Sequence, residues 1–158
     1  MTHTRRYALV ILLVLALPVS LLAQARSHAY AEVGAGATDV NGGGEWLVAD
    51  SPVGVGGQVG LGWALLGALN VSYHLFARPA ANYDVFATVG YMGLSSSEFS
   101  SHGVSLGGGG IYWVASRVGL RVDAFGFMPA KTTNNIRVEE RSPSRYWGVR
   151  AGVAVGFR

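Results

Sequence analysis

The final segment of the chain, residues 146–158, alternates at every position between apolar side chains and side chains that are small or polar. Successive side chains of a β-strand point to opposite faces, so this segment predicts a strand with one wholly apolar face. Such a face is either buried in a core or turned toward lipid. The apolar positions are Trp147, Val149, Ala151, Val153, Val155 and Phe157.

The length of this segment favours lipid. Trp147 and Phe157 are ten residues apart, which corresponds to about 33 Å of extended strand. Tilted by roughly 40°, the strand rises about 25 Å, the height of the apolar band of outer-membrane barrels. We therefore predict that Trp147 is an interfacial aromatic residue, with Tyr112 and Trp63 on other strands, and that Phe157 carries the C-terminal assembly signal.

Six further segments alternate in the same way, and they predict an all-β fold. A bacterial barrel of this kind has an even number of strands, so an eighth strand is needed at residues 45–50 or 135–140. Connection lengths favour 45–50, with loops at 40–44, 95–102 and 129–144. The predicted architecture is a single up-and-down antiparallel transmembrane β-barrel. The six segments are residues 28–37, 54–63, 69–76, 85–92, 104–113 and 118–125.

Composition agrees with a membrane protein that crosses with strands. Only 13% of the residues are charged, whereas soluble domains carry about 25%. No apolar stretch after the N-terminal region approaches the ~20 residues of a transmembrane helix. The chain has no cysteine, so disulfides do not hold the domain together. Nothing in the charge pattern indicates nucleic-acid binding.

The N-terminus has the features of a secretory signal. Arg5 and Arg6 precede an uncharged apolar run at residues 7–22, and Ala23-Gln24-Ala25 offers small residues for cleavage. We predict a signal peptide at residues 1–25 and an outer-membrane barrel domain at residues 26–158. An uncleaved membrane anchor is the alternative, because the apolar run is nearly long enough to span a bilayer.

Residues 103–123, GVSLGGGGIYWVASRVGLRVD, resemble the OmpA- and OmpX-like small outer-membrane β-barrels of Gram-negative bacteria. The shared features are a glycine-rich strand, a short turn and a strand with a GLR-x-D pattern, and residues 70–76 and 86–91 are also similar. The resemblance covers residues 53–158. It implies a monomer that contacts outer-membrane lipids, lipopolysaccharide and the barrel-assembly machinery. One departure is the C-terminus, where Arg158 follows the aromatic Phe157.

The non-apolar faces of the predicted strands carry several charges. An isolated charge inside a narrow barrel is costly, so we predict that the charged side chains form pairs. Closure of the first strand on the last would bring Glu32 near Arg150, and Asp123 near Arg150 or Arg121. A salt-bridged interior fits eight strands, whose side chains fill the lumen, and a narrow polar path for ions is the alternative. The predicted lumen set is Glu32, Gln58, Arg121, Asp123 and Arg150.

No motif predicts catalysis, a cofactor or a metal. Residues 103–107 match the G-x-S-x-G string, but a nucleophile elbow needs a helix after the serine, and glycines follow instead. Ser72 and His74 share a predicted lumen face, which indicates a hydrogen-bonded interior histidine. The four histidines show no metal-ligand spacing. The alternative functions are a soluble periplasmic, lipocalin-like barrel that binds an apolar ligand and a membrane-embedded lipid-modifying enzyme.

Overall fold

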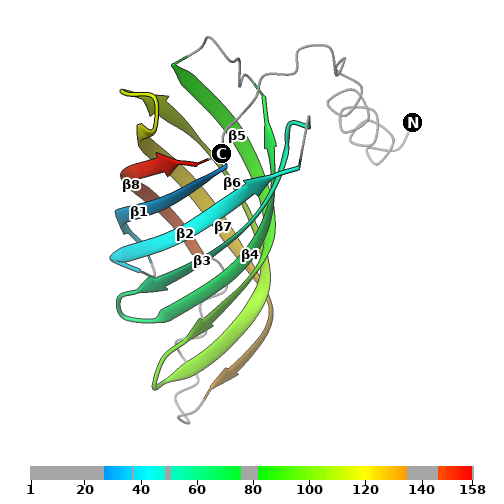
Figure 1. Cartoon of the computed structure of the whole chain (residues 1–158). Helices are drawn as coiled ribbons and strands as arrows, with labels where there is room; N and C mark the ends of the chain where they lie inside the picture. Colours follow the sequence, from blue (N-terminus) through cyan, green and yellow to red (C-terminus); the bar gives the residue numbers. More distant parts are fainter. Residues whose placement is uncertain (1–26, 37, 49–50, 76–81, 135–145, 158) are drawn as a thin grey trace, which may run out of the picture.

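The computed structural model describes residues 27–36, 38–48, 51–75, 82–134 and 146–157, and within them every regular element is a strand. The strands follow one another around a closed antiparallel barrel (Figure 1). No helix among these residues could cross a membrane, and the predicted signal peptide lies outside them. The strands are β1 (His28–Ala35), β2 (Val40–Leu47), β3 (Val53–Leu61), β4 (Leu65–His74), β5 (Tyr83–Ser95), β6 (Phe99–Trp113), β7 (Val118–Asn134) and β8 (Tyr146–Gly156).

The barrel closes by pairing of its first and last strands, as the sequence predicted. β1 runs antiparallel to β8, with Glu32 opposite Gly152 and Gly34 opposite Arg150. Because the number of strands is even, β1 begins and β8 ends at the same end of the barrel, which we call the terminal end. The turns at 62–64 and 96–98 lie at the opposite end, which we call the far end.

The alternation in β8 separates the two faces of the wall as predicted. Trp147, Val149, Ala151, Val153 and Val155 are exposed on the outside, whereas the residues between them point inward. The same arrangement holds around the barrel, so the outer surface is apolar and the interior holds the charges. The glycines of the inner face make room for larger neighbours. A Cβ atom on Gly43, for example, would lie 2.6 Å from the ring of Tyr30.

All three loop predictions are wrong, in whole or in part. The run at residues 40–44, which we expected to be a loop, belongs to β2, and its inward-facing Gly43 accommodates the ring of Tyr30 on β1. The region 129–144 is strand up to Asn134, and β6 already begins at Phe99, within the predicted 95–102 loop. The β6–β7 pairing shifts register between His102 and Gly103, and this bulge accommodates Pro129, which lacks a backbone N–H. The alternative eighth strand at 135–140 lies outside the described residues.

Strands β5, β6 and β7 are longer than the others and form a tall wall. β7 has 17 residues and β1 has 8, and the pairing of β7 with β8 ends at Phe127 and Tyr146. Beyond this point β5, β6 and β7 continue to pair with one another past the far end of the shorter strands (Figure 1). The molecule therefore projects on one side of its far end.

A charge on the outer face should test which surface meets lipid. Val153 is 44% exposed near the middle of β8, and Val153→Arg is expected to lower the free energy of unfolding in lipid by about 2–4 kcal/mol. The same change at Val114, in the 114–117 turn at the terminal end, is expected to cost about 0–1 kcal/mol. Urea unfolding in lipid vesicles measures both, and equal losses would contradict the proposed lipid-facing surface.

Gly152→Ser is not a neutral control for this experiment, although the sequence alone predicts a mild effect. A Cβ atom on Gly152 would collide with the carbonyl oxygen of Ala31 and would lie 2.6 Å from the Cα of Glu32. Both are backbone atoms of the paired strand β1, so they cannot move aside cheaply. A side chain at position 152 is therefore expected to destabilise the barrel, as a charge on the outer face does. The reason at position 152 is a steric collision.

Candidate functional site: the polar interior of the barrel

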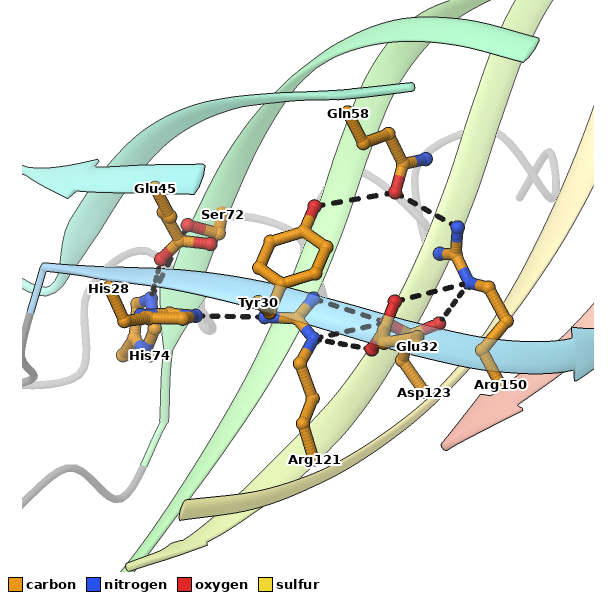
Figure 2. A network of polar contacts seen from close by, with 10 residues as sticks. All are labelled: His28, Tyr30, Glu32, Glu45, Gln58, Ser72, His74, Arg121, Asp123 and Arg150. Atoms are coloured by element: carbon orange, nitrogen blue, oxygen red, sulfur yellow. Dashed lines mark hydrogen bonds and ion pairs between the residues drawn. The ribbon is translucent and has the colours of Figure 1, made fainter. Parts of the chain in front are cut away.

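Buried polar side chains gather in the terminal half and middle of the barrel interior (Figure 2), beside an apolar cluster that includes Ile111 and Trp113. A second apolar cluster fills the interior toward the far end. The polar part consists of two groups of residues, which we call the arginine network and the histidine clamp. The arginine network comprises Tyr30, Glu32, Gln58, Arg121, Asp123 and Arg150. The histidine clamp comprises Glu45, Ser72, His74 and Asp84.

The arginine network brings together all four charged residues that the sequence predicted to meet. Arg121 Nε lies 2.9 Å from Glu32 Oε1, and Arg121 Nη2 lies 3.1 Å from Asp123 Oδ2. Arg150 Nε lies 2.8 Å from Asp123 Oδ1 and 3.6 Å from Glu32 Oε2. All four side chains are buried. Two carboxylates thus face two guanidinium groups, and the network carries no net charge.

Backbone register explains why these residues meet. Asp123 on β7 pairs with Arg150 on β8, and Arg121 lies two positions away on the same face of β7. Closure of β8 against β1 then places Glu32 opposite Gly152, beside Arg150. Since Gly152 has no side chain, both arginines can reach the Glu32 carboxylate. The four charges therefore join three strands, one of them across the closing seam.

Polar and aromatic groups surround the two arginines. Arg150 Nη1 donates to Gln58 Oε1 at 2.9 Å, and the Tyr30 hydroxyl donates to the same oxygen. The Arg121 guanidinium lies 4.1 Å from the centre of the Tyr30 ring, and the Arg150 guanidinium lies 4.5 Å from that of Phe125. These contacts extend the network across the barrel to β3 and stabilise the cations through ring faces.

The histidine clamp holds an imidazole between two carboxylates. His74 Nδ1 lies 2.8 Å from Asp84 Oδ2, and His74 Nε2 lies 2.5 Å from Glu45 Oε1. An ionised carboxylate can only accept a hydrogen bond, and a neutral imidazole has only one N–H. Both contacts are satisfied together when His74 carries a proton on each nitrogen. The geometry is therefore that of an imidazolium ion that links β2, β4 and β5.

Sequence reasoning placed His74 in the interior but missed both of its acidic partners. Glu45 was missed because the glycine run before it was interpreted as a turn. Asp84 directly precedes the predicted strand at 85–92, and extending the alternation by one residue would have placed it on the inner face with Phe86. The signal for Asp84 was therefore present in the sequence pattern.

The clamp has the connectivity of a serine–histidine–acid triad without its chemistry. Ser72 Oγ lies 3.3 Å from His74 Nε2, and Asp84 holds Nδ1. A triad needs Nε2 free to take the serine proton, but Glu45 occupies that nitrogen at 2.5 Å. Ser72 is also only 2% exposed. The arrangement therefore supports an ion pair rather than an activated nucleophile.

His28 lies beside both groups. Its Nε2 is 2.9 Å from Arg121 Nη1, and since a guanidinium only donates hydrogen bonds, Nε2 is the acceptor. The ring also packs against Tyr30 and Trp113, with ring centres 5.9 and 6.2 Å apart. Within the part of the chain that the structure describes, no group of histidines and acids has the arrangement of a metal site.

Toward the far end, the interior becomes apolar. A cluster of buried side chains from β4, β5, β6 and β7 fills it, and Tyr146 of β8 packs against them. Between this cluster and the arginine network lies a cavity of about 20 Å³, lined in part by Gln58, Asn70 and Ser105. A single buried water needs roughly 10–15 Å³. The cluster comprises Ala64, Leu66, Ala68, Met92, Leu94, Phe99, Phe125 and Phe127.

The predicted interfacial aromatics have different positions. Trp147 is 75% exposed on the outer face at the far end, and Tyr112 is exposed on the outer face near the terminal end. Trp63 does not lie on the outer wall, because the chain bends at 62–64. Its ring contacts Phe99 and Tyr146, with centres 5.5 and 5.6 Å apart, and its indole nitrogen donates to the carbonyl of Gly36. Trp63 therefore packs over the apolar cluster.

Phe157 follows β8 at the terminal end. Its backbone nitrogen donates to the carbonyl of Ser27 at 2.9 Å, and its ring lies 5.2 Å from that of Trp46. Phe157 thus extends the pairing of β8 with β1 by one residue past the end of both strands. Its assigned role in assembly stays a prediction.

Comparison with known structures supports the fold. The N-terminal β-barrel domain of Pseudomonas aeruginosa OprF superimposes with a TM-score of 0.65 at 14% identity, over 83% of this chain and 96% of that domain. A major outer membrane protein from Thermus thermophilus has a TM-score of 0.56 at 15% identity, over 84% of this chain and 100% of the other. No protein-family model and no curated protein matches the sequence. The fold is thus the closed β-barrel of these two outer-membrane proteins.

Proposed function

We propose that this chain is an integral outer-membrane β-barrel protein with a structural or surface-interaction role, a closed lumen and no catalytic activity. The observation that carries this proposal is the inverted distribution of polarity, with charges inside and large apolar side chains outside. Both termini would lie in the periplasm, as in bacterial barrels with an even number of strands. The far end with its tall wall would then face the outside of the cell, and residues 1–25 would direct export.

Aromatic side chains flank the apolar outer surface at both ends. Trp46, Tyr83 and Tyr112 are exposed at the terminal end, and Tyr91 and Trp147 are exposed toward the far end. Such residues form the girdles of membrane barrels, because their rings are apolar and their edges are polar. Their positions support a membrane band that spans the wall between them.

The soluble, lipocalin-like alternative is not favoured. A cup for an apolar ligand requires an apolar interior and a polar outer surface. In this barrel the interior contains four buried acids and two buried arginines, while the outer face of β8 is apolar along its length. In water that surface would cause aggregation.

Interior packing supports a closed lumen. Any path from the terminal end would have to pass the arginine network and then the apolar cluster beneath Trp63. Side chains can fill the interior of an eight-stranded barrel. The cavity between the arginine network and the apolar cluster has room for about one water molecule. We infer that ions do not cross, and single-channel recording in planar bilayers would reveal any conductance.

Lipids and lipopolysaccharide are the partners we propose for the outer surface, with the barrel-assembly machinery as a transient partner. Arg137, Arg141 and Arg145, which belong to the segment between β7 and β8, lie outside the described residues. We propose that the barrel works as a monomer, because closure of the sheet leaves no exposed edge along the membrane band.

Cell fractionation tests the proposed location. The protein is expected in the outer-membrane fraction and to change its gel mobility on boiling, since a closed barrel stays compact in detergent until it is heated. Recovery in the periplasmic extract, without a mobility change, would overturn the proposal.

A substitution at the end of the last strand tests assembly. Phe157→Asp places a charge beside Trp46 at the terminal-end girdle, and we expect the variant to be depleted from the outer membrane. Phe157→Tyr keeps an aromatic ring and serves as the matched control. Immunoblots of separated membranes measure both variants, and normal outer-membrane levels of the aspartate variant would contradict this role.

A further inference from the structure

The outer face of the tall wall changes from apolar to polar between two successive rungs of the sheet. A rung is here a row of residues that pair with one another across neighbouring strands. Tyr91, Val104 and Met128 face one another across β5, β6 and β7 and are exposed. On the next outward-facing rung toward the far end, Gly93 pairs with His102, and His102 pairs with Lys131. In the orientation proposed above, this second rung lies where the lipid headgroups of the outer leaflet begin.

His102 and Lys131 form a basic pair on this rung. Both are exposed, and direct cross-strand neighbours have Cβ atoms about 4.5–5.5 Å apart. The Tyr91 hydroxyl hydrogen-bonds to His102 Nδ1, which orients the ring and leaves Nε2 as its other nitrogen. Among the described residues, neither member of the pair forms an ion pair with a carboxylate. An ammonium group and an imidazole N–H side by side can both donate hydrogen bonds to one anion.

A shallow depression adjoins the basic pair on the outer surface. Gly67 of β4 pairs with Gly93 of β5, so two neighbouring strands have no side chain at this height. A Cβ atom on Gly67 would meet nothing within 4 Å, and one on Gly93 would meet only a carbonyl oxygen at 3.9 Å. The depression lies between Leu69 and Tyr91 on one side and the far rim on the other. The two missing side chains leave room for a slender apolar chain against the backbones of β4 and β5.

We propose that this surface, formed by Gly67, Tyr91, Gly93, His102 and Lys131, binds a phosphorylated glycolipid of the outer leaflet. The phosphate would accept hydrogen bonds from Lys131 and from Nε2 of His102, because charge-assisted bonds to phosphate are among the strongest of surface contacts. An acyl chain of the same lipid would cross the depression at Gly67 and Gly93. This proposal rests on the proposed outer-membrane location. It adds a specific lipid-binding site on the outer surface of the barrel.

Native mass spectrometry of the folded protein in detergent tests the site, with diphosphorylated lipid A as the probe. The His102→Asn/Lys131→Gln variant is expected to bind lipid A at least tenfold more weakly, because it loses the ammonium donor of Lys131 and the imidazole donor of His102. Arg117→Gln removes an exposed charge at the opposite end and is expected to bind like the wild type. Gly93→Val fills the depression and is expected to weaken binding while the pair of basic residues stays intact.

The outcomes separate this site from the proposed function. Parallel titrations with phosphatidylglycerol and phosphatidylcholine show whether a phosphorylated glycolipid is preferred over a simple anionic or a neutral lipid. Equal binding of all three lipids, or unchanged lipid A binding by the double variant, would overturn the site while leaving a heat-modifiable barrel in the outer membrane. A protein that does not form a heat-modifiable barrel would overturn both.

Discussion

Arg150→Gln is expected to lower the free energy of unfolding by about 3–5 kcal/mol, because removing one member of a buried ion pair leaves an uncompensated charge. Arg150 Nε lies 2.8 Å from Asp123 and 3.6 Å from Glu32. Both carboxylates would keep Arg121 as their remaining cation, so the network would hold one excess negative charge. The neutral glutamine can replace the hydrogen bond to Gln58 but not the charge.

Glu32→Gln is expected to lower the free energy of unfolding by a similar amount, because it leaves an excess positive charge in the network. The carboxylate lies 2.9 Å from Arg121 and is 2% exposed, so its removal leaves two buried guanidinium groups facing only Asp123. In the double variant, one acid and one arginine remain, and the network is again neutral. The double change should therefore be milder than the sum of the single changes, because the two residues are energetically coupled.

The cycle is measured by urea unfolding in detergent micelles or lipid vesicles. Arg117→Gln is the control, because it removes one cation from an exposed turn. Its free energy of unfolding should stay within about 0.5 kcal/mol of the wild-type value. Strict additivity of Glu32→Gln and Arg150→Gln would mean that the two side chains do not share a network. In that case β1 and β8 would not close the sheet in the register seen here.

The sequence predicts the arginine network because each step follows from strand geometry. Alternation places Arg121, Asp123 and Arg150 on inner faces, and closure places Glu32 beside them. No step depends on side-chain conformation. The fold was predictable for the same reason, since the apolar face of β8 repeats with a period of two and is long enough to cross a membrane.

Departures from regular strand geometry could not be predicted in the same way. The bend at 62–64 takes Trp63 off the outer wall and over the far end, although alternation from Val55 to Leu61 predicts an outward side chain. The bulge at His102 and Gly103 shifts the register of the tall wall and sets the basic pair on one rung. Local patterns do not encode these shifts, because they depend on which partner strand each residue meets.

The interior glycines show why β2 was misassigned. A glycine run normally indicates a turn, but here glycines face bulky inward neighbours. Gly43 lies against Tyr30, and Gly54 lies against Glu45 and Ser72. The histidine clamp therefore depends on small residues of the neighbouring strands, which the interpretation of one strand at a time cannot reveal.

His74→Gln is expected to be among the most destabilising single substitutions in the described part of the chain. It removes the cation between Glu45 and Asp84, whose carboxylates are both buried. Glutamine is neutral, so two uncompensated negative charges would then share a low-dielectric interior. Loss of one partner from a buried ion pair costs about 3–5 kcal/mol, and here two acids lose the same partner.

Neutralising the acids should reverse much of this loss. In the His74→Gln background, the added changes Glu45→Gln and Asp84→Asn remove both buried charges, and replacing all partners of an ion pair is far milder than removing one. Ser72→Ala is the matched control, because it removes only the 3.3 Å contact of a neutral hydroxyl. Urea unfolding with the gel-mobility change as readout compares the four proteins. If the triple variant is no more stable than His74→Gln, the role of His74 is to fill space rather than to hold β2, β4 and β5 together by its charge.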